Sequence, residues 1–314
     1  MLLPEDRYNF SAKKTKKKGT LGILLFGIVL IAAALGAVLY INYSDSLFKK
    51  DQSSEEVIKE YWRAQKYKEL IELTENKLVE DPLNPTALVF NGFSSFYQST
   101  REFTLEEKLH YLDKSVLALR KALLLEEIPL REGVHYVLGK AYYHKGRYYS
   151  DLAVKYLHKS LEEGYSGEDT YEYLGLAYNN MENYEEAAKY FALAAEKRPT
   201  DVLYLTLAQI FIELGREDDV EEYLIRAINM TGDLSLEEKS RYLLANFYME
   251  KGELLKAESQ YKNILEKNEN AADAHFHLGE IYNRMNDTVK ARAEWRKTLL
   301  IDPSHYGARL NLYN

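Results

Sequence analysis

One pattern of small and large residues recurs along the chain, and it constrains the fold more than any other feature. In the stretch "YLGLAYNNMENYEEAAKYFALAAEKRP" (173–199) the key residues are separated by 3, 9, 4, 3 and 5 residues: Gly175, Tyr178, Ala187, Phe191, Ala194 and Pro199. Residues three or four apart share one face of a helix. The stretch therefore predicts two amphipathic helices, joined by a turn and ended by the proline.

The same spacing returns four more times, with one set containing a two-residue insertion between its helices. The residues at the predicted helix crossing and beside it are Gly139, Tyr142, Ala153 and Leu157; Ala208, Phe211, Val220 and Leu224; Ala245, Tyr248, Ala257 and Tyr261; Gly279, Tyr282, Ala291 and Trp295. Two less regular units precede these, in 51–84 and 85–129. A single unit cannot bury its apolar faces alone, so neighbouring units are expected to stack.

These residues resemble the tetratricopeptide repeat (TPR), a helix–turn–helix unit of about 34 residues. The resemblance implies an all-α chain with about seven repeats stacked as a right-handed superhelical α-solenoid over 51–305. The predicted repeats are 51–84, 85–129, 132–167, 168–200, 201–236, 238–271 and 272–305. Residues 306–314 are predicted to form a C-terminal capping helix.

Composition agrees with a helical binding protein and provides no catalytic centre. Glycine (16) and proline (6) are scarce among the 314 residues, and there is no cysteine, which excludes disulfides and thiolate chemistry. His275 and His277 are two residues apart on a predicted helix and point to different faces, so they are poor joint metal ligands. "GVHYVLGK" has five residues between its glycines, where a phosphate-binding loop has four. We expect no enzyme activity, no cofactor and no metal.

Charge is divided unevenly between the N-terminus and the rest of the chain. Residues 1–50 hold eight Lys or Arg and three Asp or Glu, whereas the other 264 residues hold 33 basic and 46 acidic side chains. An acidic main domain argues against nucleic acid as a partner.

An uninterrupted apolar run, "LGILLFGIVLIAAALGAVLYI" (21–41), follows the basic run "KKTKKK". Its length is that of a membrane-spanning helix, and the positive flank puts the N-terminus in the cytoplasm. The sequence thus predicts a cytoplasmic tail (1–19), a transmembrane helix (20–42), a linker (43–50) and an extracytoplasmic repeat domain, periplasmic in a bacterium. A cleaved signal peptide is the competing interpretation. Ala and Gly spaced four apart in this run would permit a homodimer through the transmembrane helix.

The resemblance also implies where partners would bind. In such arrays the first helices of the repeats line a concave groove, and carrying the register over gives a predicted protein-binding groove: Phe93, Phe96, Tyr136, Lys140, Tyr143, Tyr173, Leu205, Gln209, Tyr242, Asn246, Met249, Phe276 and Glu280. Such a surface suits peptide or helical segments of other proteins, because aromatic anchors dominate binding energy.

Three functional hypotheses follow. The first is a non-enzymatic, membrane-anchored scaffold or adaptor that helps to assemble an envelope complex, such as a flagellar, secretion or outer-membrane assembly. The second is a membrane-tethered periplasmic chaperone that holds unfolded clients. The third is an organelle import receptor, with the repeats in the cytosol. The scaffold predicts one or few partners, whereas the chaperone predicts many weak ones.

Overall fold

The computed structural model describes residues 54–313, which form fifteen α-helices and one short 3₁₀ helix. The chain divides into two compact units, Met1–Lys66 and Tyr67–Asn314. In the first unit the described helix is α2 (Ser54–Arg63), with Glu55 and Glu56 in its first turn and Arg63 at its end. These charges complement the helix dipole.

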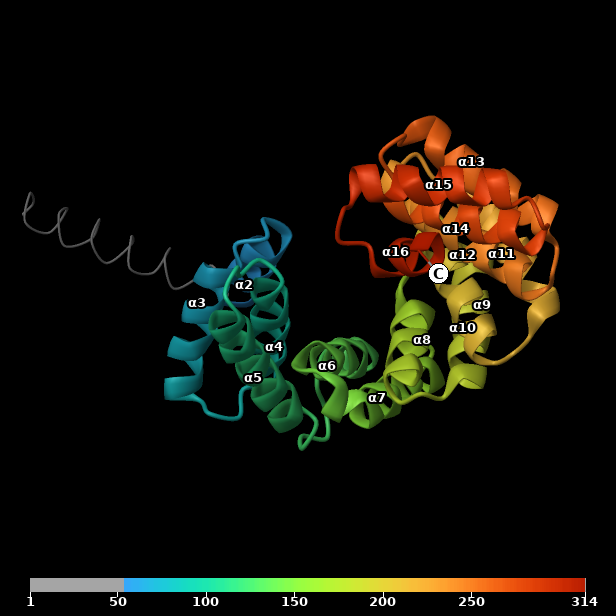
Figure 1. Cartoon of the computed structure of the whole chain (residues 1–314). Helices are drawn as coiled ribbons and strands as arrows, with labels where there is room; N and C mark the ends of the chain where they lie inside the picture. The colour runs from blue at the N-terminus through green and yellow to red at the C-terminus, as the bar shows by residue number, and fades with distance from the viewer. Residues whose placement is uncertain (1–53, 314) are drawn as a thin grey trace, which may run out of the picture. The chain divides into compact units, whose positions relative to one another are not determined.

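The second unit is a succession of helices (Figure 1). Their bounds are α3 (Tyr67–Glu80), α4 (Pro85–Ser99), α5 (Leu105–Ala122), α6 (Arg131–Lys145), η1 (Arg147–Tyr149), α7 (Ser150–Glu162), α8 (Thr170–Asn180), α9 (Tyr184–Lys197), α10 (Asp201–Glu213), α11 (Glu217–Met230), α12 (Leu234–Glu250), α13 (Leu254–Lys267), α14 (Ala272–Arg284), α15 (Thr288–Ile301) and α16 (Tyr306–Tyr313).

Within this unit the helices pack in consecutive pairs. Apart from α3 with α4, six pairs have the most extensive contacts: α4 with α5, α6 with α7, α8 with α9, α10 with α11, α12 with α13, and α14 with α15. Each second helix also contacts the first helix of the next pair, and α6 contacts both α4 and α8. Contacts therefore join each pair chiefly to its neighbours, as expected of a stacked helical array.

Local sequence explains where these helices begin and turn. The side chains of Asn84, Thr200 and Asp233 accept hydrogen bonds from backbone N–H groups in the first turns of α4, α10 and α12. Such caps satisfy donors that the helix itself leaves free. Between α12 and α13 the chain turns at Gly252, where φ is 74°, a conformation that glycine adopts without strain.

Helix α12 begins earlier in its repeat than the other first helices. Helix α6 starts eight residues before its crossing residue Gly139, whereas α12 starts eleven residues before its crossing residue Ala245. The corresponding distances are seven residues from Asp201 to Ala208 and seven from Ala272 to Gly279. The additional turn at the start of α12 is Leu234–Glu237, and the first helices of the other repeats begin after the position that corresponds to Leu234.

Two tyrosine–carboxylate hydrogen bonds join successive pairs. Tyr248 Oη in α12 donates to Glu221 Oε1 in α11 at 2.7 Å, and Tyr282 Oη in α14 donates to Glu258 Oε1 in α13 at 2.7 Å. Each tyrosine stands three residues after the small residue at its helix crossing, so the same element is used at both junctions.

The structure corrects the predicted fold class in one respect. Between residues 54 and 313 there is no helix with the length and apolar character needed to cross a membrane. The longest helix described, α5, has 18 residues and includes charged side chains in its first and last turns. The segment 20–42, on which the predicted transmembrane helix rested, lies outside the described residues. The fold class is therefore corrected to an all-α array without an assigned anchor. The predicted localisation, a single-pass membrane protein with extracytoplasmic repeats, is corrected on the same finding.

Candidate functional site

The thirteen residues of the predicted groove differ widely in accessibility. Six of them are buried: Phe93, Phe96, Tyr136, Lys140, Leu205 and Met249. Six are half-buried: Tyr143, Tyr173, Gln209, Tyr242, Phe276 and Glu280. Asn246 is exposed. Only the last seven are accessible to a partner without a rearrangement, and we call these seven the first-helix face.

A closed cluster around Lys140 explains much of this burial. The Lys140 ammonium, on α6, donates to Asp169 Oδ2 at 2.7 Å and to Tyr136 Oη at 3.0 Å. It lies 5.6 Å from the Phe96 ring centroid on α4 and 4.6 Å from that of Tyr173 on α8. Tyr136 Oη also donates to Asp169. A buried ammonium requires such partners because its desolvation is costly. The cluster thus joins three first helices to each other and leaves Lys140 little capacity for a ligand.

Titration of the groups around Lys140 follows from the same burial. Burial, and then the charges of Lys108 and Lys140, lower the pKa of His144 to about 4. His144 is therefore a neutral imidazole at pH 7, within 2.9 Å of Tyr173 Oη. Burial, reinforced by Asp169, raises the pKa of Tyr173 and Tyr136. His144 therefore stays neutral, and Tyr136 and Tyr173 stay protonated, at neutral pH.

In the C-terminal repeats, one residue of the second helix α13 contacts three residues of the predicted groove. Tyr261, on α13, donates to Asn246 Oδ1 at 2.6 Å, and its Oη lies 3.7 Å from Met249 Sδ. The Tyr242 ring packs edge-on against it with centroids 5.9 Å apart. Burial raises the pKa of Tyr242 to about 12, so its hydroxyl is protonated and can donate. Tyr261 itself is fully buried.

The next first helix, α14, presents two further predicted residues, Phe276 and Glu280. The Phe276 ring on α14 lies 4.6 Å from the His305 ring, and Glu280 Oε2 lies 3.1 Å from His277 Nδ1. His277 stacks on Tyr261, with centroids 5.3 Å apart. His275, by contrast, is buried and pairs with Glu294 at 2.6 Å. The two histidines thus have different partners, and residues 54–313 contain no group of three or more His, Asp or Glu placed to hold a metal ion.

Two hollows flank the additional turn of α12. One is shallow and open to solvent, lies along α12 itself and is lined by Leu234, Ser235, Glu238, Lys239, Tyr242 and Leu243. The other, of about 140 Å³, lies between α12 and α13. We call the second one the α12–α13 pocket, and its lining residues are Leu234, Glu237, Glu238, Arg241, Asn263, Ile264, Lys267 and Asn268.

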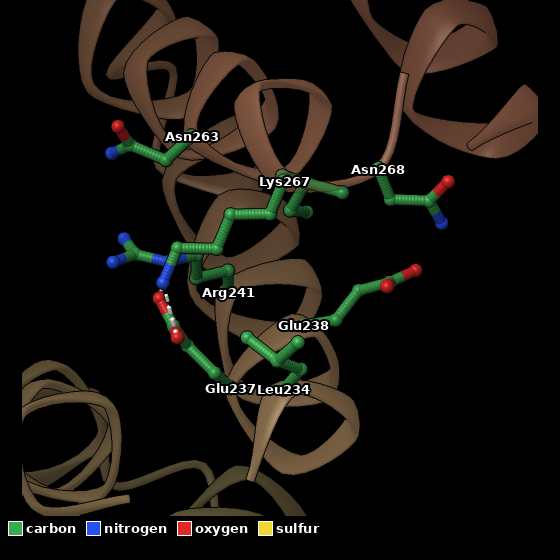
Figure 2. A pocket seen from close by; sticks show the side chains of 8 residues that line it. Leu234, Glu237, Glu238, Arg241, Asn263, Lys267 and Asn268 are labelled. Carbon is green, nitrogen blue, oxygen red and sulfur yellow. Dashed lines mark hydrogen bonds and ion pairs between the residues drawn. The ribbon is translucent and has the colours of Figure 1, made fainter. Parts of the chain in front are cut away.

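An ion-paired group forms one wall of the α12–α13 pocket (Figure 2). Lys267 Nζ donates to Glu237 Oε2 at 2.5 Å, and Arg241 Nε donates to Glu237 Oε1 at 2.8 Å. These two cations hold the pKa of Glu237 below its usual value, with Lys267 the stronger influence. The carboxylate therefore stays ionised and fixes the additional turn of α12 to the end of α13.

Sequence reasoning missed Asp169, Tyr261 and the α12–α13 pocket. Asp169 stands in the loop before α8 and Tyr261 on a second helix, whereas the predicted groove drew on first-helix positions. An available signal was the replacement of an aromatic residue by Arg241 at a position where other repeats have Tyr171 or Tyr204.

Comparison with known proteins also indicates an array of helical repeats. Sequence profiles of the tetratricopeptide repeat match residues 169–201 and 242–305. No curated protein matches the chain significantly. The first range contains the pair α8–α9, and the second contains the C-terminal part of α12 with the whole of α13, α14 and α15.

Solved structures share the fold at low sequence identity. The C-terminal part of a TPR repeat-containing protein from Cytophaga hutchinsonii is 16% identical, with a TM-score of 0.61 over 82% of this chain and 99% of that chain. YrrB, described as a TPR protein with an unusual peptide-binding site, is 22% identical, with a TM-score of 0.51 over 62% of this chain and 97% of that chain. At such identities the likeness concerns the fold alone. Residues 169–201 and 242–305 are tetratricopeptide repeats, within an array of helix pairs similar to those of solved TPR proteins.

Proposed function

We propose that this protein is a non-enzymatic scaffold whose first-helix face binds segments of partner proteins. The observation that carries the proposal is the surface of α12. Tyr242 is half-buried and Asn246 exposed four residues further on, beside an open surface of α12 that also includes Leu234. Four residues is one helical turn, so the two side chains lie on one face.

Chemistry on this face suits a peptide ligand. Tyr242 offers a ring held in place by Tyr261, and a rigid aromatic residue binds a partner at low entropic cost. Asn246 offers an amide whose oxygen already accepts from Tyr261, which leaves its N–H₂ group oriented for an acceptor. An aromatic anchor beside an oriented amide is the combination that recognises an extended or helical segment.

YrrB, a TPR protein of similar fold with an unusual peptide-binding site, supports the proposal. Assembly of an envelope complex depended on the membrane anchor and is not carried into this proposal. The choice between a scaffold with few partners and a chaperone with many is an outcome of the test.

Photocrosslinking in cells tests the proposal. A photoreactive residue replaces Tyr242 or Asn246, and the matched control replaces Leu255, which is 75% exposed on the second helix α13. One or two discrete adducts from the first two positions, absent from the control, would support the scaffold. A broad range of unrelated adducts would favour the chaperone. Equal adducts from all three positions, or none, would contradict both.

A further inference from the structure

The cluster around Lys140 has a counterpart at the junction of α12 and α14, and that counterpart lacks the lysine. Residues of the two junctions correspond when they stand at the same distance from the crossing residue of their own first helix. The three corresponding pairs are Tyr136 and Tyr242, Lys140 and Asn246, and Asp169 and Asp273. The second junction therefore keeps the tyrosine and the carboxylate, whereas an amide takes the place of the ammonium.

Without a lysine beside it, Asp273 is open to solvent. Asp169 accepts from Lys140 at 2.7 Å, and its side chain is 27% exposed. The Asp273 side chain is 72% exposed, and its nearest charged or titratable contact is His305 Nε2 at 3.3 Å. The carboxylate of the second junction is thus accessible to a cation from outside the chain.

Tyr261 fills the interior of this junction. Its ring contacts both Tyr242 and His277, with centroids 5.9 Å and 5.3 Å away, and it is completely buried. A cation from a partner would therefore reach Tyr242 and Asp273 from the solvent side of the junction.

Carboxylates gather around Tyr242. Glu238 stands one helical turn before it on α12 and lines the same shallow hollow. Burial, and then the charges of Glu238 and Asp273, raise the pKa of Tyr242 to about 12. Glu280 acts on Tyr261 in the same direction, after burial and Tyr242. Three carboxylates from two first helices thus lie close to one pair of rings.

The helices that carry most of the first-helix face have a surplus of negative charge. Five of its seven residues lie on α10, α12 and α14, and these helices hold seven Asp or Glu against three Lys or Arg. Two of the three cations are already engaged: Arg241 donates to Glu237 at 2.8 Å, and Arg284 donates to the Met249 carbonyl at 3.1 Å. The third, Lys239, is exposed. The face is therefore complementary to a basic ligand.

Other tyrosines of these helices lie beneath cations of the chain itself. The Lys256 ammonium is 5.0 Å from the Tyr248 ring centroid, and the Lys290 ammonium is 5.3 Å from that of Tyr282. Among residues 54–313, no Lys or Arg lies over the Tyr242 ring in this way. An ammonium or guanidinium over an aromatic face is attracted by the electron density of the ring. Tyr242 thus combines a half-buried ring that has no cation of its own with nearby negative charge.

We propose that the part of the first-helix face on α12 and α14 binds a basic segment of a partner protein, with one Lys or Arg side chain between Tyr242, Glu238 and Asp273. The inference rests on the proposed function and names the chemistry of its partner. Lys140 shows within this chain how a tyrosine hydroxyl and a carboxylate hold an ammonium, at 3.0 Å and 2.7 Å. The N–H₂ group of Asn246 would donate to a backbone carbonyl of the segment.

Titration of the full chain with two pentapeptides tests the required charge. The probe is acetyl-Gly-Arg-Gly-Arg-Gly-amide, and the control peptide has citrulline in place of both arginines, which keeps the size of the side chain and removes its charge. The readout is the NMR shift of the backbone amides of Tyr242 and Ala274. We expect a saturable shift with the arginine peptide, and affinity for the citrulline peptide weaker by about fivefold or more. Equal affinity, or no saturable shift, would overturn the proposal.

Charge variants connect the shift to this face. Glu238→Gln combined with Asp273→Asn should weaken binding of the arginine peptide by about fivefold or more. The matched control, Glu185→Gln combined with Glu196→Gln, removes two exposed carboxylates from the second helix α9 and should change the affinity by less than about twofold. If the first double variant does not fold, as judged by circular dichroism, Asp273→Asn alone serves in its place. Equal weakening in variant and control would show attraction by the net charge of the chain and would refute the site.

The two proposals fail separately. Crosslinks from Tyr242, together with equal affinity for the two peptides, would leave the scaffold standing and refute the basic partner. Selective binding of the arginine peptide that is lost in the Glu238→Gln, Asp273→Asn chain would support the basic site even if crosslinking at Tyr242 yielded no adduct.

Discussion

Trp295 of α15 packs directly on Gly279 of α14, so closely that a Cβ at position 279 would lie 2.3 Å from the indole Nε1. The same relation joins Gly175 to Phe191 at 2.8 Å and Gly139 to Leu157 at 2.7 Å. Glycine here brings two helices together, and a large residue of the second helix covers its backbone. The repeating pattern of small and large residues in the sequence arises from this contact, because each repeat needs a small residue on its first helix and a large one on its second.

Gly279→Ala should therefore destabilise the protein, although alanine favours helices. The added methyl group displaces Trp295, and overpacking of this kind costs about 1–3 kcal/mol, which exceeds the gain in helix propensity. Urea denaturation followed by circular dichroism measures the change. Gly133→Ala in α6 is the matched control, because a Cβ there meets its nearest neighbour at 3.6 Å and should be neutral or stabilising.

Ser95→Ala should stabilise the protein by a small amount. The Ser95 side chain is completely buried between α4 and its neighbours, and within the described residues its hydroxyl has no hydrogen-bond partner. Removing an unsatisfied buried hydroxyl recovers about 1 kcal/mol or less. Ser94→Ala is the control, because Ser94 Oγ donates to the Phe90 carbonyl at 2.5 Å. A loss of stability in Ser95→Ala at least as large as in Ser94→Ala would contradict this account.

Asp169→Ala should destabilise the protein more than Lys140→Met does. The first change leaves an ammonium whose side chain is 9% exposed without its carboxylate, whereas the second leaves a carboxylate whose side chain is 27% exposed. Breaking a buried pair from one side costs about 3 kcal/mol. Thermal or urea unfolding of the two variants decides the order. Equal losses would mean that water reaches Lys140 as readily as Asp169.

His144 should make stability fall as the solution is acidified. Its pKa is about 4 in the folded protein and about 6.5 when unfolded, so the unfolded chain binds the extra proton between these values. The contribution is complete above pH 6.5 and declines as pH falls toward 4, by up to about 3 kcal/mol in total. His144→Gln should flatten the difference in unfolding free energy between pH 7 and pH 5. An unchanged difference would show that His144 is not the responsible group.

The helix pairs were predictable because their determinants are local. Gly175 and Phe191 stand 16 residues apart, and the hydrophobic period of each helix is visible in the sequence. The Lys140 cluster was not predictable in this way. Its partner Asp169 lies 29 residues further on, in a loop, and only the stacking of α6 on α8 brings the two charges together.

The prediction of groove residues was limited because packing between helices, which is not visible in the local sequence, decides which side chains are buried. First-helix positions identified Tyr242 and Asn246 as candidates, but the register does not state which residues a neighbouring helix covers, and Met249 and Leu205 are buried. The α12–α13 pocket lies between the first turns of α12 and the end of α13, which are about 30 residues apart in the sequence, as Lys267 and Glu237 are. The expected anchor rested on hydropathy alone, and the described helices include none that could span a membrane.

The hydrogen bonds from Tyr248 to Glu221 and from Tyr282 to Glu258 have a consequence for how the array comes apart. Each one fixes a first helix to the second helix before it, so fraying of α14 from the C-terminal side removes the tyrosine that donates to Glu258 of α13. Opening of one repeat then weakens the next, because each opened repeat removes a hydrogen-bond partner from its neighbour. The segment from α11 to α15 should exchange its amide protons as one cooperative block, with nearly equal protection along its length.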